Sequence, residues 1–186
     1  MSILSGKEIQ RAVKDGRIAI DPYDVSLINP VSVDLRLGSS VRMYENTPGR
    51  GPLDCRDQAS LQAYGRSEIT DEGFVLWPNH LYLMHTLERV STHYFVPILD
   101  GKSSIGRLGI QVHMTAGFGD PGFDGQYTLE VTTVYPVRVY AGMRFCQMRF
   151  HMIAGEVALY DGSYTGEAST GPVPSRVWKQ FKETKR

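Results

Sequence analysis

The segment 100–107 gathers the residue types that proteins use to hold phosphate groups, in the order Asp-Gly-Lys-Ser-Ser-Ile-Gly-Arg. Ser103 and Ser104 can begin a helical turn whose free N–H groups face an anion, and Lys102 and Arg107 supply matching positive charge. The segment is not a P-loop, because that motif requires glycine at position 96 and the chain carries valine there. A capped turn with two solvated cations is the alternative, and the pattern alone slightly favours it.

Two carboxylates further along the chain are candidates for acid–base chemistry. Asp120 opens an Asp-Pro-Gly sequence, which indicates a turn whatever the function. Glu130 lies in a segment of alternating apolar and polar residues, on the same predicted strand face as Thr128 and Thr132. Taken alone, such a glutamate faces solvent more often than it lines a site.

The sequence does not indicate a zinc-dependent site. Zinc deaminases carry a His-x-Glu pattern with a later Cys-x-x-Cys, and none of the five histidines begins such a pattern. Cys55 and Cys146 stand far apart, so they form neither a metal knuckle nor a disulfide framework. His113 alternates with Gln111 and Thr115, which predicts an ordinary strand residue. We therefore expect reduced thiols and no metal held by the protein itself.

Short β-rich elements should position these residues. In the segment 31–37, apolar residues alternate with Ser32, Asp34 and Arg36, which predicts a strand with one polar face. A pair of strands is predicted on either side of Pro78-Asn79. The remaining predicted strands have the same texture of short Val, Tyr, Phe and Leu runs. The two strands of this pair are expected at 74–77 and 81–88. The other predicted strands are at 94–99, 126–134 and 143–153.

Helices play a smaller part in the prediction. Ser5 and Glu8 have the spacing of a capping box, which predicts a helix over 5–15. Residues 175–181 can form a second, short helix. The polar segment 46–73, interrupted by glycine and proline, indicates a long irregular excursion over the surface.

The composition is that of an ordinary globular domain, and we expect a single domain over 1–186. The 20 basic and 20 acidic residues cancel, which argues against a nucleic-acid partner bound through a broad basic field. No apolar run is long enough for a membrane span, and the start lacks a signal peptide, so we expect a soluble cytoplasmic protein with no membrane partner. The glycine-rich segment 155–186 contains aromatic residues and can close over a ligand as a lid.

Several ordered motifs together resemble the dCTP deaminase family, relatives of the trimeric dUTPases. The resemblance covers nearly the whole chain apart from the excursion at 46–73. The motifs that carry it are residues 30–38 (PVSVDLRLG), 101–109 (GKSSIGRLG), 115–123 (TAGFGDPGF), 128–130 (TLE), 142–147 (GMRFCQ) and 174–176 (PSR).

The resemblance implies an all-β fold, a distorted β-barrel of the dUTPase type, assembled as a homotrimer whose sites are shared between subunits. It implies dCTP and dUTP as ligands, dTTP as an inhibitor, and Mg²⁺ that arrives on the triphosphate rather than in a carboxylate cage. The substrate-binding residues that it implies are Lys102, Ser103, Ser104, Ile105, Gly106, Arg107, Ala116, Asp120, Thr128, Leu129, Glu130, Gln147, Tyr160, Tyr164 and Glu167.

Deamination of cytosine needs a nucleophilic water at C4 and protons for N3 and for the departing ammonia. We expect Glu130 to act as the general base and then as the acid. Arg107 and Ser103 would hold the water and Glu130 in place and stabilise developing charge.

A second step is indicated by Gly117-Phe118. In the resembled family, deaminase-only members tend to carry His-Arg here, whereas bifunctional members that form dUMP carry Gly-Phe. Asp120 would then orient water toward the α-phosphorus, and pyrophosphate would leave. The alternatives are a deaminase that stops at dUTP, a dUTPase without deaminase activity, and a nucleotide-binding regulator without turnover.

The chain departs from the family pattern at three positions. The family tail reads Lys-Tyr-x-Gly-Gln, where this chain has Ser163 and Glu167 in place of the lysine and the glutamine. Loss of the cation should weaken triphosphate binding by about 1 to 3 kcal/mol. Glu167 would repel phosphate or accept a hydrogen bond from the base. Gly119 replaces a larger apolar residue, which should loosen the turn before Asp120.

Overall fold

The protein is mostly β-structure with a few short helices, as the sequence predicts. The computed structural model describes residues 2–44, 51–115, 117–166 and 170–182. The helical elements are α1 (Gly6–Lys14), η1 (Val25–Leu27), α2 (Gln58–Gln62), α3 (Ser103–Gly106) and η3 (Val177–Phe181). The strands are β1 (Ile18–Asp21), β2 (Val33–Arg36), β3 (Ser40–Tyr44), β4 (Tyr64–Glu68), β5 (Phe74–Leu76), β6 (Tyr82–Thr92), β7 (Phe95–Gly101), β8 (Ile110–Gln111), β9 (Asp124–Thr133), β10 (Val137–Val139) and β11 (Arg144–Met152).

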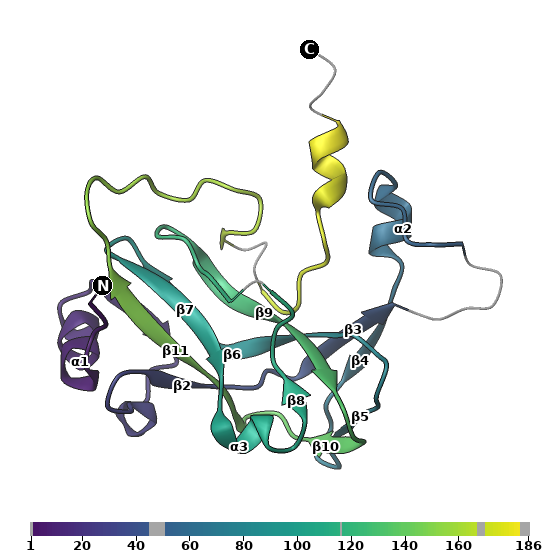
Figure 1. The fold of residues 1–186 in the computed structure, drawn as a ribbon, viewed down its shortest axis with the longest axis horizontal. Helices are drawn as coiled ribbons and strands as arrows, with labels where there is room; N and C mark the ends of the chain where they lie inside the picture. The colour runs from purple at the N-terminus through teal and green to yellow at the C-terminus, as the bar shows by residue number, and fades with distance from the viewer. Residues whose placement is uncertain (1, 45–50, 116, 167–169, 183–186) are drawn as a thin grey trace.

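The strands form three antiparallel sheets around one apolar core. The largest has the order β4-β3-β6-β9-β8, with β1 also paired to β6, the second has the order β2-β11-β7, and the third joins β10 to β5. Figure 1 shows β7, β11 and β2 on the side of α1, with β9 and β6 behind them. Among the described strands, hydrogen bonds do not join these sheets into one closed barrel. The β-rich class is therefore confirmed, and the closed barrel is not seen.

The predicted first helix is confirmed by its cap. The Glu8 N–H donates to Ser5 Oγ at 3.3 Å, and α1 buries Ile9 and Ala12 against the core. Since a side-chain oxygen at this position satisfies an N–H that has no partner within the helix, the sequence signal and the structure agree. The strands predicted at 94–99, 126–134 and 143–153 also appear, as β7, β9 and β11.

The predicted pairing across Pro78-Asn79 is wrong. β5 pairs with β10, whereas β6 pairs with β9, β3 and β1. The turn between them is held by a side chain, because the Trp77 N–H donates to the Tyr82 hydroxyl at 2.9 Å. Alternation reports which face of a strand is buried but does not name the neighbouring strand.

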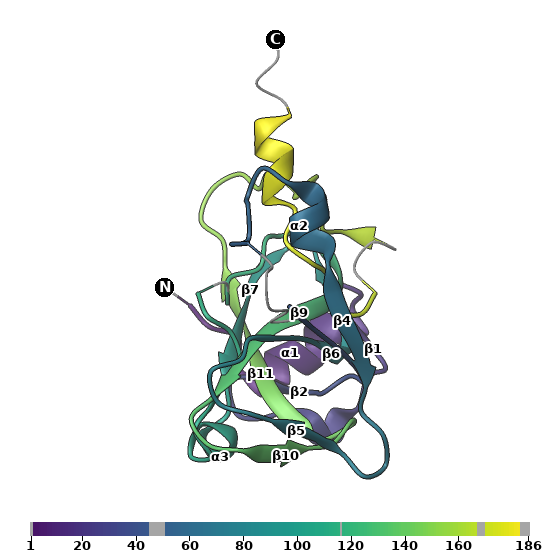
Figure 2. The same ribbon diagram turned by 90° about the vertical axis from the view of Figure 1, so that its right-hand side faces the viewer.

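The segment 46–73 is more ordered than predicted over its described part. Asp57 caps α2 by accepting from the Ala59 and Ser60 N–H groups. β4 then pairs with β3 along its length. Figures 1 and 2 both show α2 and η3 projecting from the same side of the body, where Lys182 Nζ donates to Gln58 Oε1 at 3.3 Å.

The expected polar face of the strand at 31–37 is largely buried. Asp34 is 1% exposed and accepts hydrogen bonds from Asn29 Nδ2 at 2.7 Å and from Lys102 Nζ at 2.5 Å. Val31, the first apolar residue of the predicted alternation, is 54% exposed. β2 is covered on both sides because it lies beneath η1 and beside β11, and a buried carboxylate is tolerated only when it is paired in this way.

A second buried carboxylate lies on β6. Glu88 is fully buried, and its two oxygens accept from the backbone N–H of Arg36 at 2.8 Å and from Arg36 Nε at 2.6 Å. This pair links β2 of one sheet to β6 of another. The sheets are therefore joined by an ionic contact as well as by apolar packing.

His85 makes the stability of the fold depend on pH. Burial lowers its pKa below the ordinary value of 6.5, against the opposing effect of the nearby Glu68 carboxylate. Nδ1 contacts the Thr86 carbonyl at 2.9 Å, so it carries the proton, and Nε2 accepts from the Ser40 N–H at 3.2 Å. Protonation at Nε2 removes that hydrogen bond.

We therefore expect stability to fall as pH drops below about 6.5, since the unfolded chain then binds a proton that the folded chain does not. Thermal unfolding from pH 8 to pH 5 measures this loss, and His85→Gln should flatten the profile. His80→Gln, at an exposed position, is the control and should keep the wild-type slope. Equal slopes in all three proteins would contradict the assignment.

Candidate active site

The segment 117–119 runs along β7 as an added antiparallel stretch. The Leu99 N–H donates to the Gly117 carbonyl at 2.6 Å, and the Gly119 N–H donates to the Pro97 carbonyl at 2.8 Å. A Cβ on Gly117 would lie 2.6 Å from the Leu99 carbonyl oxygen, so only glycine fits there. Phe118 points outward and is 63% exposed.

The predicted Asp-Pro-Gly turn is present and places Asp120. The Phe123 N–H donates to the Asp120 carbonyl at 3.2 Å, and Gly122 has φ of 93°. This positive φ at the third turn position is the geometry of a type II turn, which favours glycine. The Gly122 N–H also donates to the Thr92 carbonyl at 2.8 Å, which ties the turn to β6.

Strand β9 presents alternate side chains to the same side as Asp120. Gln126, Thr128 and Glu130 face the cavity described below, whereas Leu129 is fully buried in the core. The side chain of Leu129 therefore does not reach a ligand, and a role in substrate binding would fall to its backbone. Glu130 Oε2 accepts from the Met114 N–H at 3.1 Å, which holds one carboxylate oxygen in place.

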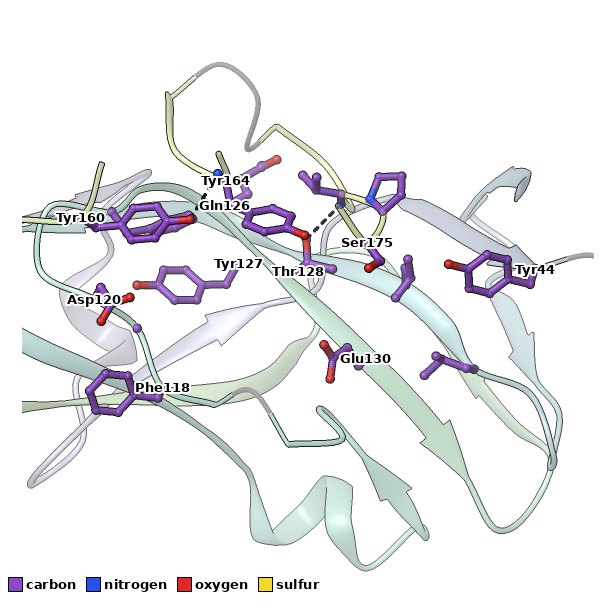
Figure 3. Close-up of a pocket in the computed structure, with 16 residues that line it drawn as sticks. Tyr44, Phe118, Asp120, Gln126, Tyr127, Thr128, Glu130, Tyr160, Tyr164 and Ser175 are labelled. Carbon is purple, nitrogen blue, oxygen red and sulfur yellow. Dashed lines mark hydrogen bonds between the residues drawn. The ribbon is translucent and has the colours of Figure 1, made fainter. Parts of the chain in front are cut away.

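These residues line a cavity of about 410 Å³ (Figure 3). Its wall combines β9, the turn at 118–123, the start of β6 and the C-terminal segment. Figure 3 shows Glu130 and Asp120 on the same side of β9, with Phe118 at the rim. The lining residues are Tyr44, Leu81, Leu83, Phe118, Gly119, Asp120, Phe123, Gln126, Tyr127, Thr128, Glu130, Tyr160, Tyr164, Val173, Pro174 and Ser175.

The C-terminal segment is held over the cavity by backbone donors. The Tyr160 N–H donates to the Pro121 carbonyl at 2.7 Å, and the Val173 N–H donates to Thr128 Oγ1 at 3.0 Å. The Gly171 N–H donates to Gln126 Oε1 at 2.6 Å. Side chains of β9 thus serve as acceptors for this segment, which is the arrangement that a lid over the cavity would require.

The two predicted tyrosines of this segment are coupled to each other. The Tyr164 N–H donates to the Tyr160 hydroxyl at 3.3 Å, and the Arg176 N–H donates to the Tyr164 hydroxyl at 2.7 Å. The Arg176 guanidinium also lies over the Tyr164 ring, 5.2 Å from its centroid. Tyr160 and Tyr164 therefore enter the cavity as part of one connected network.

The predicted phosphate-binding residues form a separate cluster at α3. None of residues 102–107 lines the cavity. Ser103, Ser104 and Arg107 are exposed, while Ile105 is buried. The helical turn that the two serines predict is present as α3, with Gly106 as its last residue.

Lys102 and Gln147 are already engaged within this cluster. Lys102 pairs with Asp34, and Gln147 bridges the Ser32 hydroxyl and the Gly101 carbonyl at 2.9 Å each. One subunit thus brings Asp120, Thr128, Glu130, Tyr160 and Tyr164 together, and leaves Gln147 and residues 102–107 apart from them. Ala116 and Glu167 lie outside the described residues.

Sequence analysis did not single out several cavity residues, namely Tyr44, Phe123, Gln126, Tyr127 and Val173. A signal existed for Phe123 and Ser175, because residues 115–123 and 174–176 are two of the family-like motifs. Tyr127 belongs to the alternating segment 126–134, and that pattern does not distinguish it from any other strand residue. His113, expected in a strand, lies in the loop after β8, and its Nδ1 is buried without a hydrogen-bond partner among the described residues.

Within the described part of the chain, no three His, Cys, Asp or Glu side chains gather as a metal site requires. None of the helices described is long and apolar enough to cross a membrane. Cys146 is buried, Cys55 is exposed, and both are free thiols.

Comparison with known proteins identifies the relatives of this fold and site. A family model described as dCTP deaminase-like matches residues 3–153. A "dCTP deaminase, dUMP-forming" from Leptospira biflexa is 43% identical over 182 residues, covering 97% of this chain and 99% of the relative. A protein of the same description from Hathewaya histolytica is 42% identical over 181 residues, covering 96% and 99%.

Among solved structures, the 2'-deoxycytidine 5'-triphosphate deaminase from Agrobacterium tumefaciens is similar, with a TM-score of 0.62 and 25% identity. The match covers 80% of this chain and 46% of that longer chain. Its description agrees with that of the family model, which matches most of the present chain. The chain therefore belongs to the dCTP deaminase family.

Proposed function

We propose that this protein converts dCTP to dUMP in two hydrolytic steps, in pyrimidine deoxynucleotide metabolism. The balanced reaction consumes dCTP and two waters and releases dUMP, pyrophosphate and ammonia. The observation that carries the proposal is the presence of Glu130 and Asp120 on one cavity wall, in a chain whose curated relatives are described as dUMP-forming dCTP deaminases.

In the first step, Glu130 removes a proton from water, and the oxygen attacks C4 of the cytosine ring. That proton moves to N3, and the second proton passes through Glu130 from the new C4 hydroxyl to the amino group. The bond from C4 to the amino nitrogen then breaks and ammonia leaves, so the ring becomes uracil. The Met114 N–H fixes Oε2 of Glu130, which leaves Oε1 for the water. A positioned carboxylate of this kind supplies about 10² to 10⁴ in rate.

In the second step, Asp120 orients a water toward the α-phosphorus. The water oxygen bonds to that phosphorus, the bond to the bridging oxygen breaks, and pyrophosphate leaves. Gly117 and Phe118 support this step, since glycine lets the backbone pack on the Leu99 carbonyl and Phe118 lines the exposed rim of the cavity. Mg²⁺ would accompany the triphosphate and neutralise its charge.

The triphosphate would be held by Ser103, Ser104 and Arg107 of a neighbouring subunit, with Lys102 nearby. Support comes from the separation of α3 from the cavity of its own subunit, since the described residues that line this cavity include no lysine or arginine. The assembly would be a homotrimer, in which each site combines two subunits. Inhibition by dTTP and a cytoplasmic location remain predictions.

Shared sites predict a specific result when two inactive variants are co-expressed. Trimers mixed from Glu130→Gln and Arg107→Ala subunits should recover about one quarter of wild-type ammonia release, because each residue is intact in half of the subunits. If each site lay within one subunit, every site would lack one residue and no activity would return. Each variant expressed alone is the control.

Product analysis with dCTP as sole substrate tests the function itself. We expect ammonia, pyrophosphate and dUMP in equal amounts. Ammonia with dUTP would indicate a deaminase that stops after the first step. Turnover of dUTP but not dCTP would indicate a dUTPase, and binding without any product would indicate a regulator.

A further inference from the structure

The Tyr127 hydroxyl occupies the space that a side chain at position 119 would need. A Cβ on Gly119 would lie 2.7 Å from Tyr127 Oη and 2.9 Å from Pro97 Cγ. The backbone there is held by the Gly119 N–H donating to Pro97. The phenol of Tyr127 therefore fills the volume left by the glycine, and the expected loosening of this turn stays a prediction.

The hydroxyl is directed to the cavity and toward Asp120. Figure 3 shows the phenol oxygen of Tyr127 pointing toward the Asp120 carboxylate. The ring is fixed by an edge contact with Phe123, with centroids 4.8 Å apart, and by the Tyr127 N–H donating to Thr86 Oγ1 at 2.9 Å. The phenol is thus a rigid group at the base of the cavity.

The hydroxyl is also a free donor. No described protein atom accepts a hydrogen bond from it, although a tyrosine hydroxyl in a buried setting usually has a partner. Burial, and then the neighbouring charge of Asp120, raise the pKa of Tyr127. The phenol therefore keeps its proton at neutral pH and can donate it. A phenylalanine would fill the same volume without this capacity.

We propose that Tyr127 is a positioning residue for the second step, whose hydroxyl donates to Asp120 and thereby aligns the water that attacks the α-phosphorus. This inference rests on the proposed function. The attacking water loses its proton to the free oxygen of Asp120, its oxygen bonds to phosphorus, and pyrophosphate leaves. Tyr127 keeps its own proton throughout and acts only through Asp120.

Tyr127→Phe tests the hydroxyl without changing the ring. We expect pyrophosphate release from dUTP to fall by about tenfold or more, the size of effect of a hydrogen bond to a charged group. With dCTP as substrate, dUTP should then accumulate relative to dUMP, normalised to the ammonia released. Tyr94→Phe, at a position 56% exposed, is the control and should keep the wild-type product ratio.

A purely space-filling role would leave the product ratio of Tyr127→Phe unchanged, and this outcome overturns the inference. An equal fall in ammonia and pyrophosphate release also overturns it. If the wild-type protein gave no ammonia or pyrophosphate from dCTP or dUTP, the proposed function would fail as well, and the wild-type assay alone would reveal this.

Gly119→Ala provides a second test, because the new methyl group displaces the hydroxyl. Alone, it should raise the proportion of dUTP as Tyr127→Phe does. In the Tyr127→Phe background its further effect on that proportion should be smaller, since the hydroxyl is absent and only the contacts with Pro97 Cγ at 2.9 Å and with Cε1 of the ring at 3.1 Å remain. Additive effects of the two substitutions on the product ratio would contradict the proposed contact.

Discussion

Glu130→Gln should lower ammonia release from dCTP by a factor of about 10² to 10⁴, the contribution of a positioned general base. The amide has the size of the carboxylate, and its oxygen can still accept from the Met114 N–H. It cannot take a proton from water. Nucleotide binding should therefore remain measurable by calorimetry while turnover in an ammonia assay is lost.

The matched control for this change is Glu72→Gln. Glu72 is exposed and contributes only its backbone carbonyl, which accepts from Arg138 at 2.8 Å. Its loss of charge should leave ammonia release at the wild-type rate. Unchanged turnover in Glu130→Gln would eliminate this carboxylate as the base, whatever the binding data show.

Arg36→Met should lower stability by about 3 to 5 kcal/mol, because it leaves the Glu88 carboxylate buried without its cation. Glu88 is fully buried, and the 2.6 Å contact with Arg36 Nε is lost, while the backbone N–H of residue 36 still donates. For a chain of this length the loss corresponds to a fall in Tm of about 6 to 20 °C. Thermal unfolding measures it directly.

A surface ion pair provides the comparison that isolates the cost of the buried charge. Arg11→Met is the control, because Arg11 pairs with Glu8 at 2.8 Å on the surface, with side chains 66% and 43% exposed. Such a pair contributes about 0 to 1 kcal/mol. Equal destabilisation by the two substitutions would be inconsistent with a special cost at Glu88.

The departures from the family pattern bear on the substrate. Ser163 carries no positive charge beside Tyr164, where the family has a lysine. No contact among the described residues tests its effect on triphosphate binding, so the expected weakening stays a prediction. At Gly119 the departure is accompanied by a phenol that fills the space, as the contacts of Tyr127 show. The effect of a glycine such as Gly119 therefore depends on which side chain lies beside it in the folded structure.

The sequence by itself determined the local structure of this protein. The Ser5 cap, the turn at Asp120 with its glycine at positive φ, and the alternation of β9 depend on residues close together in the chain, and each appears as predicted. The same holds for the helical turn at α3. Local backbone preferences and periodicity act over a few residues, so a sequence pattern captures them.

Only the tertiary structure decided which distant groups meet. Alternation could not show that β5 pairs with β10, or that Asp34 and Glu88 are buried with Lys102 and Arg36 as partners. Nor could it show that the C-terminal segment closes one side of the cavity while α3 stands apart from it. These arrangements arise from the packing of whole sheets against each other, and the burial of each charge is acceptable only because a residue far away in the chain compensates it.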